Sequence, residues 1–233
     1  MLKRKSDTCI SCESCNERSP LFSLLSIEEL KIMNANRFEV IFNTGENIVK
    51  QGTSASHMIM ITSGMAKLYL EGFDKKNLLL EIISPWQLFG GPGIFTDYRY
   101  HYSVSALVET SACFISIENM RKVMRTNPDF SEALLKNCSR GGVSNFERLI
   151  SLTQKQMHGR LADVLLYLSE KIYASKHFSL NITRQEIGEM SNMTKESATR
   201  ILKEFEHAGI IKLETKEVTI NDMEKLKQLS LHG

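Results

Sequence analysis

The chain has 233 residues, of which 42% are hydrophobic and 24% charged, and its formal net charge is +2 at pH 7. This composition is typical of a soluble globular protein with room for two domains, and it excludes a strongly basic domain. The longest apolar runs fall short of the roughly 18 residues that span a bilayer, and no apolar stretch follows the basic N-terminus. We therefore expect a cytoplasmic protein without membrane contact.

Three cysteines lie close together near the N-terminus, in an arm that we place at residues 1–20. Cys9, Cys12 and Cys15 are separated by two residues each. In an apparently cytosolic chain, thiolates at this spacing can converge on one metal centre, as in an iron–sulfur ligand run. Zinc is the second candidate, because three or four thiolates at short spacing suit tetrahedral coordination. The third alternative is an arm that binds no metal.

Residues 21–127 carry short strand-like segments separated by glycine-containing turns. Ser26 is placed to cap a short helix through Leu30, and residues 116–124 have a helical period. The regular spacing of the strand-like runs predicts an all-β sandwich or barrel. These runs are residues 38–42, 48–50, 58–61, 66–70, 78–83 and 103–108.

A long helix is predicted from about residue 128 to residue 156. Its apolar stripe is too long for one small domain to cover. Gly141 and Gly142 interrupt the stripe, and adjacent glycines, at roughly 1 kcal/mol each relative to Ala, mark a kink or a close approach of another backbone. One interpretation is a buried core helix, and the other is a seam with a second copy of the chain, which the C-terminal motif favours. The stripe consists of Leu134, Leu135, Cys138, Val143, Phe146, Leu149, Ile150 and Leu152.

Residues 157–233 begin with an amphipathic helix, at about 159–174, and continue into two short helices around a tight turn. Thr183 is followed three residues later by Glu186, which is the capping-box spacing, so a helix should run over about 184–190. Residues 191–193 break the pattern, and a second helix starts at Thr194. Strand candidates at 210–214 and 217–220 complete a winged helix-turn-helix. The second helix carries one apolar face, made of Ala198, Ile201, Leu202 and Phe205.

The opposite face of that second helix carries residues that can read base edges. Arg200 can donate two parallel hydrogen bonds to guanine, Glu196 can accept one from cytosine, and Thr199 offers a methyl group to thymine. Because Glu196 and Arg200 are also an i, i+4 pair, the alternative is a solvated salt bridge with no DNA partner. The helix-turn-helix spacing favours base reading, with a G·C pair in each half-site. Backbone or flanking contacts are expected from Arg184, Lys195, Ser197 and Lys203.

Net charge gives DNA binding less support than the motif does. From residue 151 onward there are 12 Lys and Arg against 11 Asp and Glu. Phosphate contacts must then come from a local arrangement of cations and helix N-termini. A regulatory or ligand-binding β-roll protein that does not bind DNA is therefore the alternative function. An enzyme is not expected, since no hydrolase elbow, P-loop or metalloprotease helix motif is present.

In this order the segments resemble the cyclic-AMP receptor and fumarate-nitrate reduction regulator (CRP/FNR) family. The resemblance is carried by Gly45-Glu46-x-Ile48-x-x-x-Gly52, the turn at residues 63–64, the glycine cluster at 90–93, the long helix and Glu196-x-x-Thr199-Arg200. It implies an α+β fold: a β-roll sensor resembling a cyclic-nucleotide-binding jelly roll at 21–127, a dimerisation helix at 128–156 and a winged helix-turn-helix domain at 157–233. It also implies a homodimeric transcription factor that binds a palindromic operator, senses a signal and contacts RNA polymerase.

The resemblance also bears on the signal. Cyclic-nucleotide members of the family have Gly-Glu after a Phe in the glycine cluster and an Arg-Ser pair further on, where Glu holds the ribose hydroxyl and Arg the cyclic phosphate. Here the cluster reads Phe89-Gly90-Gly91, and the later positions align near Tyr100-His101, with Arg99 close by. Since both main polar anchors are missing, we expect an effector pocket at these residues that does not take cyclic AMP.

The oxygen-sensing branch of the family offers a fourth ligand for the N-terminal cysteines. That branch carries its distant cluster cysteine after a Glu-Thr-Ser, and here Cys113 follows Glu109-Thr-Ser-Ala. The resemblance therefore implies a four-iron four-sulfur cluster on Cys9, Cys12, Cys15 and Cys113, although that branch spaces its N-terminal cysteines more widely. Haem, with His57 and His101 as ligands, is a further alternative from the family.

Overall fold

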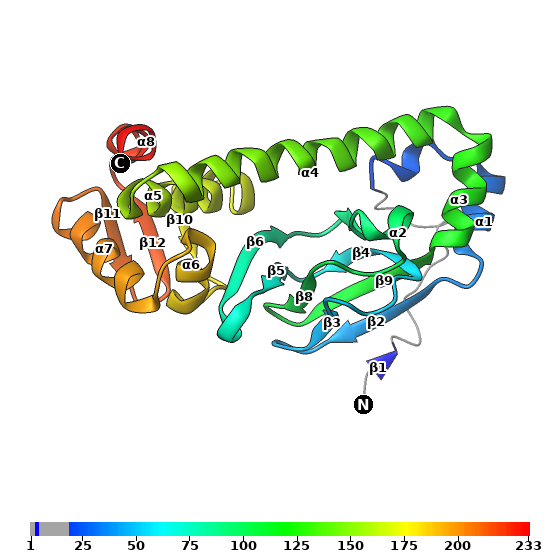
Figure 1. The fold of residues 1–233 in the computed structure, drawn as a ribbon, viewed down its shortest axis with the longest axis horizontal. Helices are drawn as coiled ribbons and strands as arrows, with labels where there is room; N and C mark the ends of the chain where they lie inside the picture. Colours follow the sequence, from blue (N-terminus) through cyan, green and yellow to red (C-terminus); the bar gives the residue numbers. More distant parts are fainter. Residues whose placement is uncertain (1–2, 5–18) are drawn as a thin grey trace. The chain divides into compact units, whose positions relative to one another are not determined.

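The computed structural model describes residues 3–4 and 19–233 (Figure 1). The described chain forms two compact units. The first contains the residues up to 71 together with 82–142, and the second contains 72–81 together with 143–233. The dividing point near the long helix therefore lies between Gly142 and Val143, inside the helix, whereas the sequence analysis placed the domain boundary near the helix end.

Two sheets build the predicted β-roll, which is confirmed, and their strands belong to the first unit except for residues 77–81. In one sheet the strands lie in the order β1 (Lys3–Arg4), β2 (Phe38–Phe42), β9 (Thr110–Ser116), β4 (His57–Ser63) and β7 (Leu88–Phe89). In the other sheet the order is β3 (Asn47–Val49), β8 (Ser103–Ala106), β5 (Ala66–Glu71) and β6 (Asn77–Ile83). Ile59, Ile61 and Ile115 are fully buried between these strands and form the centre of the core.

Short helices complete the first unit. The predicted capping residue Ser26 begins α1 (Ile27–Asn34), where its side chain accepts from the Glu29 amide and the Glu29 carboxylate accepts from the Ser26 amide. This reciprocal pair satisfies backbone donors that a helix start leaves unpaired. The other helices of the roll are η1 (Phe22–Leu24), α2 (Gly93–Thr96) and α3 (Ile117–Thr126), and the short turn η2 (Phe73–Lys75) follows β5.

The long helix α4 (Pro128–Gln154) is continuous and passes through Gly141 and Gly142 without a break. The buried-core interpretation is wrong for most of the helix, because within α4 only Phe130 and Leu134 are buried. Cys138 is exposed as well. The large apolar side chains that remain between 53% and 69% exposed are Leu135, Val143, Phe146, Leu149 and Ile150.

The second unit contains the winged helix-turn-helix, which is confirmed. Its elements in chain order are α5 (Met157–Tyr167), a π-helical turn η3 (Leu168–Ile172), β10 (His177–Ser179), α6 (Arg184–Ser191), α7 (Lys195–His207), β11 (Ile211–Glu214), β12 (Glu217–Ile220) and α8 (Met223–His232). The three strands lie in the order β10, β12, β11. The helix α8 was not expected, and it packs on α5, where Ser230 donates to Asp163 at 2.5 Å.

Capping hydrogen bonds, one left-handed residue and one glycine determine the turn between α6 and α7. Thr183 and Glu186 form the predicted capping box at the start of α6. The chain then reverses at Asn192, which adopts a left-handed backbone with φ of 49°. Gly188 permits the close packing of the turn, since a Cβ atom there would lie 2.7 Å from the Met193 carbonyl oxygen. These constraints place the start of α7 against the end of α6.

Arg148 connects α4 to two other segments of the second unit. Its Nη2 donates to the carbonyl oxygen of Met190, at the end of α6, at 2.5 Å, and also to that of Leu79 in β6. Carbonyls at a helix C-terminus have no partner within the helix, so the guanidinium satisfies one of them. Burial lowers the pKa of the Arg148 guanidinium. This side chain therefore ties the first helix of the helix-turn-helix to α4.

Candidate nucleic-acid interface

The recognition helix α7 has sharply different faces. Ala198 and Ile201 are fully buried, and Leu202 and Phe205 are nearly so, whereas Glu196 and Arg200 are exposed and Thr199 is half-exposed. Because burial of the apolar face fixes the rotation of the helix about its axis, the predicted base-reading side chains are held on the solvent side. All three lie within the first two turns of α7, which begins at Lys195.

Arg200 has an ion pair, but with a different partner from the one that the sequence suggested. Its Nη1 lies 2.5 Å from Oε1 of Glu204, one turn further along α7, whereas the salt-bridge alternative had named Glu196 as the partner. The other carboxylate oxygen of Glu204 lies 2.7 Å from Nε2 of His158 at the start of α5. The hydrogen bond from His158, followed by that from Arg200, lowers the pKa of Glu204. The i, i+4 spacing could have indicated Glu204, whereas His158 had no signal in the sequence.

The residues predicted to flank the base readers differ in how exposed their side chains are. Lys195 and Lys203 are exposed on α7, and Ser197 lies at its capped start, where its amide donates to Thr194 Oγ1 at 3.2 Å. Thr199 donates its hydroxyl to the Lys195 carbonyl at 2.7 Å. Arg184 differs from these residues, because its guanidinium is half-buried, one of its nitrogens has no hydrogen-bond partner in the described chain, and burial lowers its pKa. It is therefore less available for a phosphate than the two lysines.

In the first unit, the residues predicted to form an effector pocket come together around α2. We call residues 89–102, which include Gly90, the glycine-rich cassette. Arg99 Nη1 donates to the Gly52 carbonyl at 2.9 Å, and His101 Nε2 lies 3.0 Å from Asp97 Oδ1. Tyr100 is buried, and its hydroxyl donates to the His57 carbonyl at 2.6 Å. Burial raises the pKa of Tyr100 to about 12. The polar ends of these three side chains are therefore engaged within the chain.

Gly91 is the cassette position where the cyclic-nucleotide pattern has Glu. Its φ is +78°, a left-handed conformation that side-chain-bearing residues rarely adopt. A Cβ atom built there would lie 2.7 Å from the Tyr102 ring. The acidic side chain is thus missing from the sequence, and the local backbone also disfavours it.

Comparison with known proteins identifies the two units. Residues 39–127 match the cyclic nucleotide-binding domain, and residues 159–229 match the Crp-like helix-turn-helix domain. The chain belongs to the CRP/FNR family of transcription regulators. The predicted family is confirmed, and with it the function of a DNA-binding regulator of transcription.

Relatives within the CRP/FNR family carry different signals in their names. A CRP-like cAMP-activated global transcriptional regulator of Mycobacterium tuberculosis is 28% identical over 191 residues, which cover 80% of this chain and 85% of that protein. The transcriptional activator protein anr of Pseudomonas aeruginosa is 27% identical over 190 residues, or 80% of this chain and 78% of that protein. The structure of FixK2 from Bradyrhizobium japonicum has a TM-score of 0.76 at 17% identity, covering 83% of this chain and 96% of that chain, and supports the fold.

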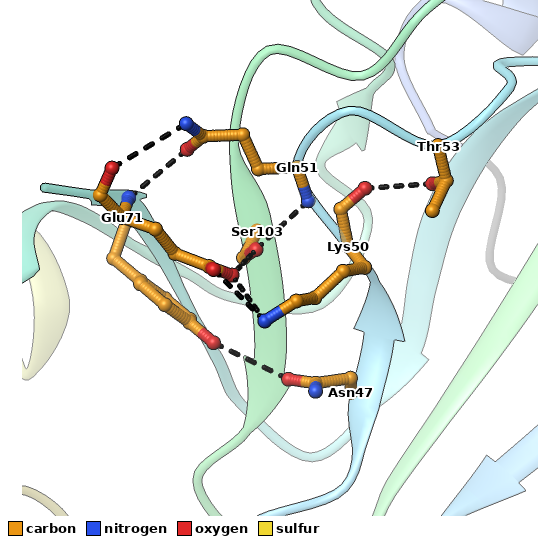
Figure 2. A network of polar contacts seen from close by, with 7 residues as sticks. Asn47, Lys50, Gln51, Thr53, Glu71 and Ser103 are labelled. Atoms are coloured by element: carbon orange, nitrogen blue, oxygen red, sulfur yellow. Dashed lines mark hydrogen bonds and ion pairs between the residues drawn. The ribbon is translucent and has the colours of Figure 1, made fainter. Parts of the chain in front are cut away.

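A polar network joins the glycine-rich cassette to the second sheet of the family's sensor domain. Figure 2 shows the Glu71 carboxylate between the Lys50 ammonium, at 2.8 Å, and the Ser103 hydroxyl, with Gln51 bonded to the Glu71 backbone. These two side-chain hydrogen bonds lower the pKa of Glu71, Lys50 contributing most. Because residues 52–55 also exchange backbone hydrogen bonds with residues 98–100, the network links the cassette to β5 and β8. None of the residues in this network was among the predicted site residues.

The cysteine predictions are only partly described by the structure. Cys9, Cys12 and Cys15 lie outside the described residues. Cys113 is fully buried in β9, and its Sγ accepts a hydrogen bond from Arg37 Nη1 at 3.1 Å. Within the described residues, no three His, Cys, Asp or Glu side chains are grouped to hold a metal ion.

The two histidines considered for haem lie in different surroundings. The His57 ring packs against Phe38 and Phe114, and its burial lowers its pKa, whereas His101 pairs with Asp97 in the cassette.

Among the helices of residues 19–233, none is both long and apolar enough to cross a membrane.

Proposed function

We propose that this CRP/FNR-family protein binds a palindromic operator as a homodimer and reads each half-site with Glu196, Thr199 and Arg200. The observation that supports it most strongly is the division of α7 into a buried apolar face and an exposed polar face. That division turns the three side chains toward solvent at the start of the helix that enters the major groove in such domains. Lys195 and Lys203, which flank them, supply phosphate contacts.

The exposed stripe of α4 supports the homodimer. Leu135, Phe146 and Leu149 lie on one side of the helix at spacings close to whole turns, with Gly142 between them. A Cβ atom added at Gly142 would meet nothing within 4 Å. Small residues on such a stripe let a second helix approach closely, and burial of the apolar side chains against an identical helix removes them from water. Two protomers joined in this way present two recognition helices to the two half-sites.

Regulation is proposed to act through the glycine-rich cassette, with a signal other than cyclic AMP. The cassette residues do not fit a cyclic nucleotide, because the position of the ribose-binding acid is Gly91 in a left-handed conformation, and Arg99 is bonded to the Gly52 carbonyl. A change in this region would reach the DNA-binding unit through α4. Contact with RNA polymerase in the cytoplasm would complete the regulatory function. The names of the relatives support a role in regulation rather than the catalysis of a reaction.

The N-terminal cysteines are a second candidate for the sensor, and the position of β1 favours them. Arg4 lies opposite Val40 in β2, and the neighbouring residue, Glu39, lies opposite Cys113 in β9. Two strand spacings separate β1 from β9 by about 10 Å. The five residues from Arg4 to Cys9 can span roughly 17 Å when extended, so the chain is long enough for Cys9 to reach Cys113. An iron–sulfur cluster, when bound, would supply a redox-sensitive centre.

The cluster is tested by anaerobic purification followed by assays of iron, acid-labile sulfide and visible absorption. Cys113→Ser should lose the iron, whereas Cys138→Ser should retain it, because Cys138 lies on α4. Wild-type protein without iron, sulfide or an absorption band would contradict the cluster.

The proposed DNA function is tested by selection from random-sequence DNA with the full-length protein, under aerobic and anaerobic conditions. We expect enrichment of a palindrome with half-sites about one helical turn apart. Arg200→Ala should enrich no palindrome while remaining folded and dimeric. Failure of the wild-type protein to prefer any palindrome under either condition would favour a β-roll regulator that does not bind DNA.

A further inference from the structure

A chain of three side chains joins α5 to the exposed face of α7. His158 Nε2 lies 2.7 Å from Glu204 Oε2, and Arg200 Nη1 lies 2.5 Å from Glu204 Oε1. Each carboxylate oxygen therefore has one partner. The His158 ring also lies against Phe205, with 6.0 Å between the ring centroids. The carboxylate that holds Arg200 is thus itself held by a different helix.

The other cations of this helix face are not held in this way. Lys195 and Lys203 are exposed, and neither has an ion-pair partner in the described part of the chain, whereas the Arg200 guanidinium is paired. A free lysine suits phosphate, which needs a mobile point charge, while a guanidinium reads guanine only in a fixed planar orientation. The recognition helix therefore carries two lysines that can move to follow DNA phosphates and one arginine, Arg200, whose guanidinium is held in one orientation.

We propose that Glu204, fixed by His158, is a specificity-determining positioning residue that aims Arg200 at a base edge and keeps it from the phosphates. The adjacent carboxylate offsets the guanidinium charge, which weakens its attraction to phosphate from any sequence. It leaves the N–H groups that do not face Glu204 free for a base. This role rests on Arg200 as a base reader, as proposed above.

The test compares affinity for the selected palindrome with affinity for a scrambled duplex, using the full-length protein. Glu204→Gln keeps the size of the side chain and removes its charge. The ratio used here is the dissociation constant for the scrambled duplex divided by that for the palindrome. We expect this ratio to fall about tenfold, because affinity for the scrambled duplex rises. The salt dependence should steepen by about 0.9 in log–log slope per subunit, because the released guanidinium neutralises one more phosphate.

Two variants separate positioning from net charge. Glu224→Gln makes the same charge change on a different helix, α8, and should leave the ratio unchanged. Glu204→Asp keeps the charge but is one methylene shorter, so it should lower the ratio as Glu204→Gln does. A wild-type ratio in folded Glu204→Asp and Glu204→Gln proteins would overturn the proposal. Equal effects of Glu204→Gln and Glu224→Gln would also overturn it, by assigning the change to net charge.

His158 is tested with a pair of substitutions. His158→Phe keeps a ring against Phe205 and removes the donor to Glu204, so the ratio should fall, whereas His158→Gln retains a donor and should restore part of it. An unchanged ratio in His158→Phe would remove His158 from the proposal.

Arg200→Ala distinguishes this inference from the proposed function. A wild-type ratio in that variant would show that Arg200 is not the base reader. A collapsed ratio in Arg200→Ala, together with wild-type ratios in the Glu204 variants, would overturn the role of Glu204 alone.

Discussion

The recognition helix α7 and the glycine-rich cassette hold their polar side chains in opposite ways. In α7 the apolar face is buried, and Glu196, Arg200 and the lysines remain at the surface. In the cassette, Tyr100 is buried and bonded to a carbonyl, and Arg99 is bonded to the Gly52 carbonyl. On α7 the lysines have no ion-pair partner in the described residues and Arg200 is paired only with Glu204 of its own helix, whereas Arg99 and Tyr100 of the cassette are bonded to backbone carbonyls of other segments.

The two units therefore resemble the rest of the family to different degrees. The reader needs only a helix with the right rotation, and the helix-turn-helix core supplies that. A cyclic-nucleotide site needs an acid and a guanidinium aimed into one pocket, and the cassette backbone at Gly91 opposes the acid. The output of the regulator is thus kept in a form typical of the family, whereas we propose that the input is different.

The largest expected effect concerns α4, the helix that we propose brings two recognition helices together. Phe146→Glu places a charge in the exposed stripe of α4, so we expect monomers and a loss of palindrome affinity of roughly 10²-fold or more, since the second half-site no longer binds intramolecularly. Sedimentation and DNA titration measure both. Phe73→Glu is the control, because Phe73 is 95% exposed but lies outside α4. A dimeric Phe146→Glu protein would show that the stripe is not the seam.

Gly91→Ala tests how strictly the backbone of the glycine-rich cassette requires glycine at this position. We expect it to lower the free energy of unfolding by about 1–2 kcal/mol for the left-handed backbone, with a further loss from the contact with Tyr102. Gly45→Ala is the matched control, since Gly45 has φ of +85° but open space around it. Thermal unfolding should therefore rank Gly91→Ala below Gly45→Ala. Equal stabilities would mean that Tyr102 does not restrict this position.

The smallest effect is expected in the network of Figure 2. The pKa of Glu71 is lowered by Lys50 and Ser103, so its contribution to stability is present above its ordinary pKa near 4.5 and is lost as pH falls through the lowered value. Glu71→Gln should cost about 0.2–1 kcal/mol at neutral pH, as for a partly exposed pair. Its unfolding should also depend less on pH below 4.5 than that of the wild type. Parallel pH profiles of the two proteins would contradict this assignment.

Local signals allowed most of the DNA-binding unit to be predicted. The capping box at Thr183 and Glu186 placed both ends of α6, and the 3.6-residue period placed the start of α7, within about one residue of those observed. The contact between His158 and Glu204 joins residues 46 apart in the sequence, so no local pattern indicates it. The helix α8 was missed, although Asp222, whose side chain accepts from the Lys225 amide at the helix start, is a capping signal in the sequence. The left-handed backbone at Gly91 was not predicted either, because glycine adopts conformations of either sign of φ and its presence alone does not select one.

The most direct test of the DNA-reading account is a comparison of two DNA sites with two proteins. Within the selected palindrome, the G·C pair assigned to Arg200 is replaced in both half-sites, and the wild-type and Arg200→Ala proteins are titrated with each site. We predict that the replacement weakens wild-type binding by about 1–3 kcal/mol per half-site and leaves Arg200→Ala binding unchanged. Equal losses in both proteins would contradict the assignment of Arg200 as the reader of that pair.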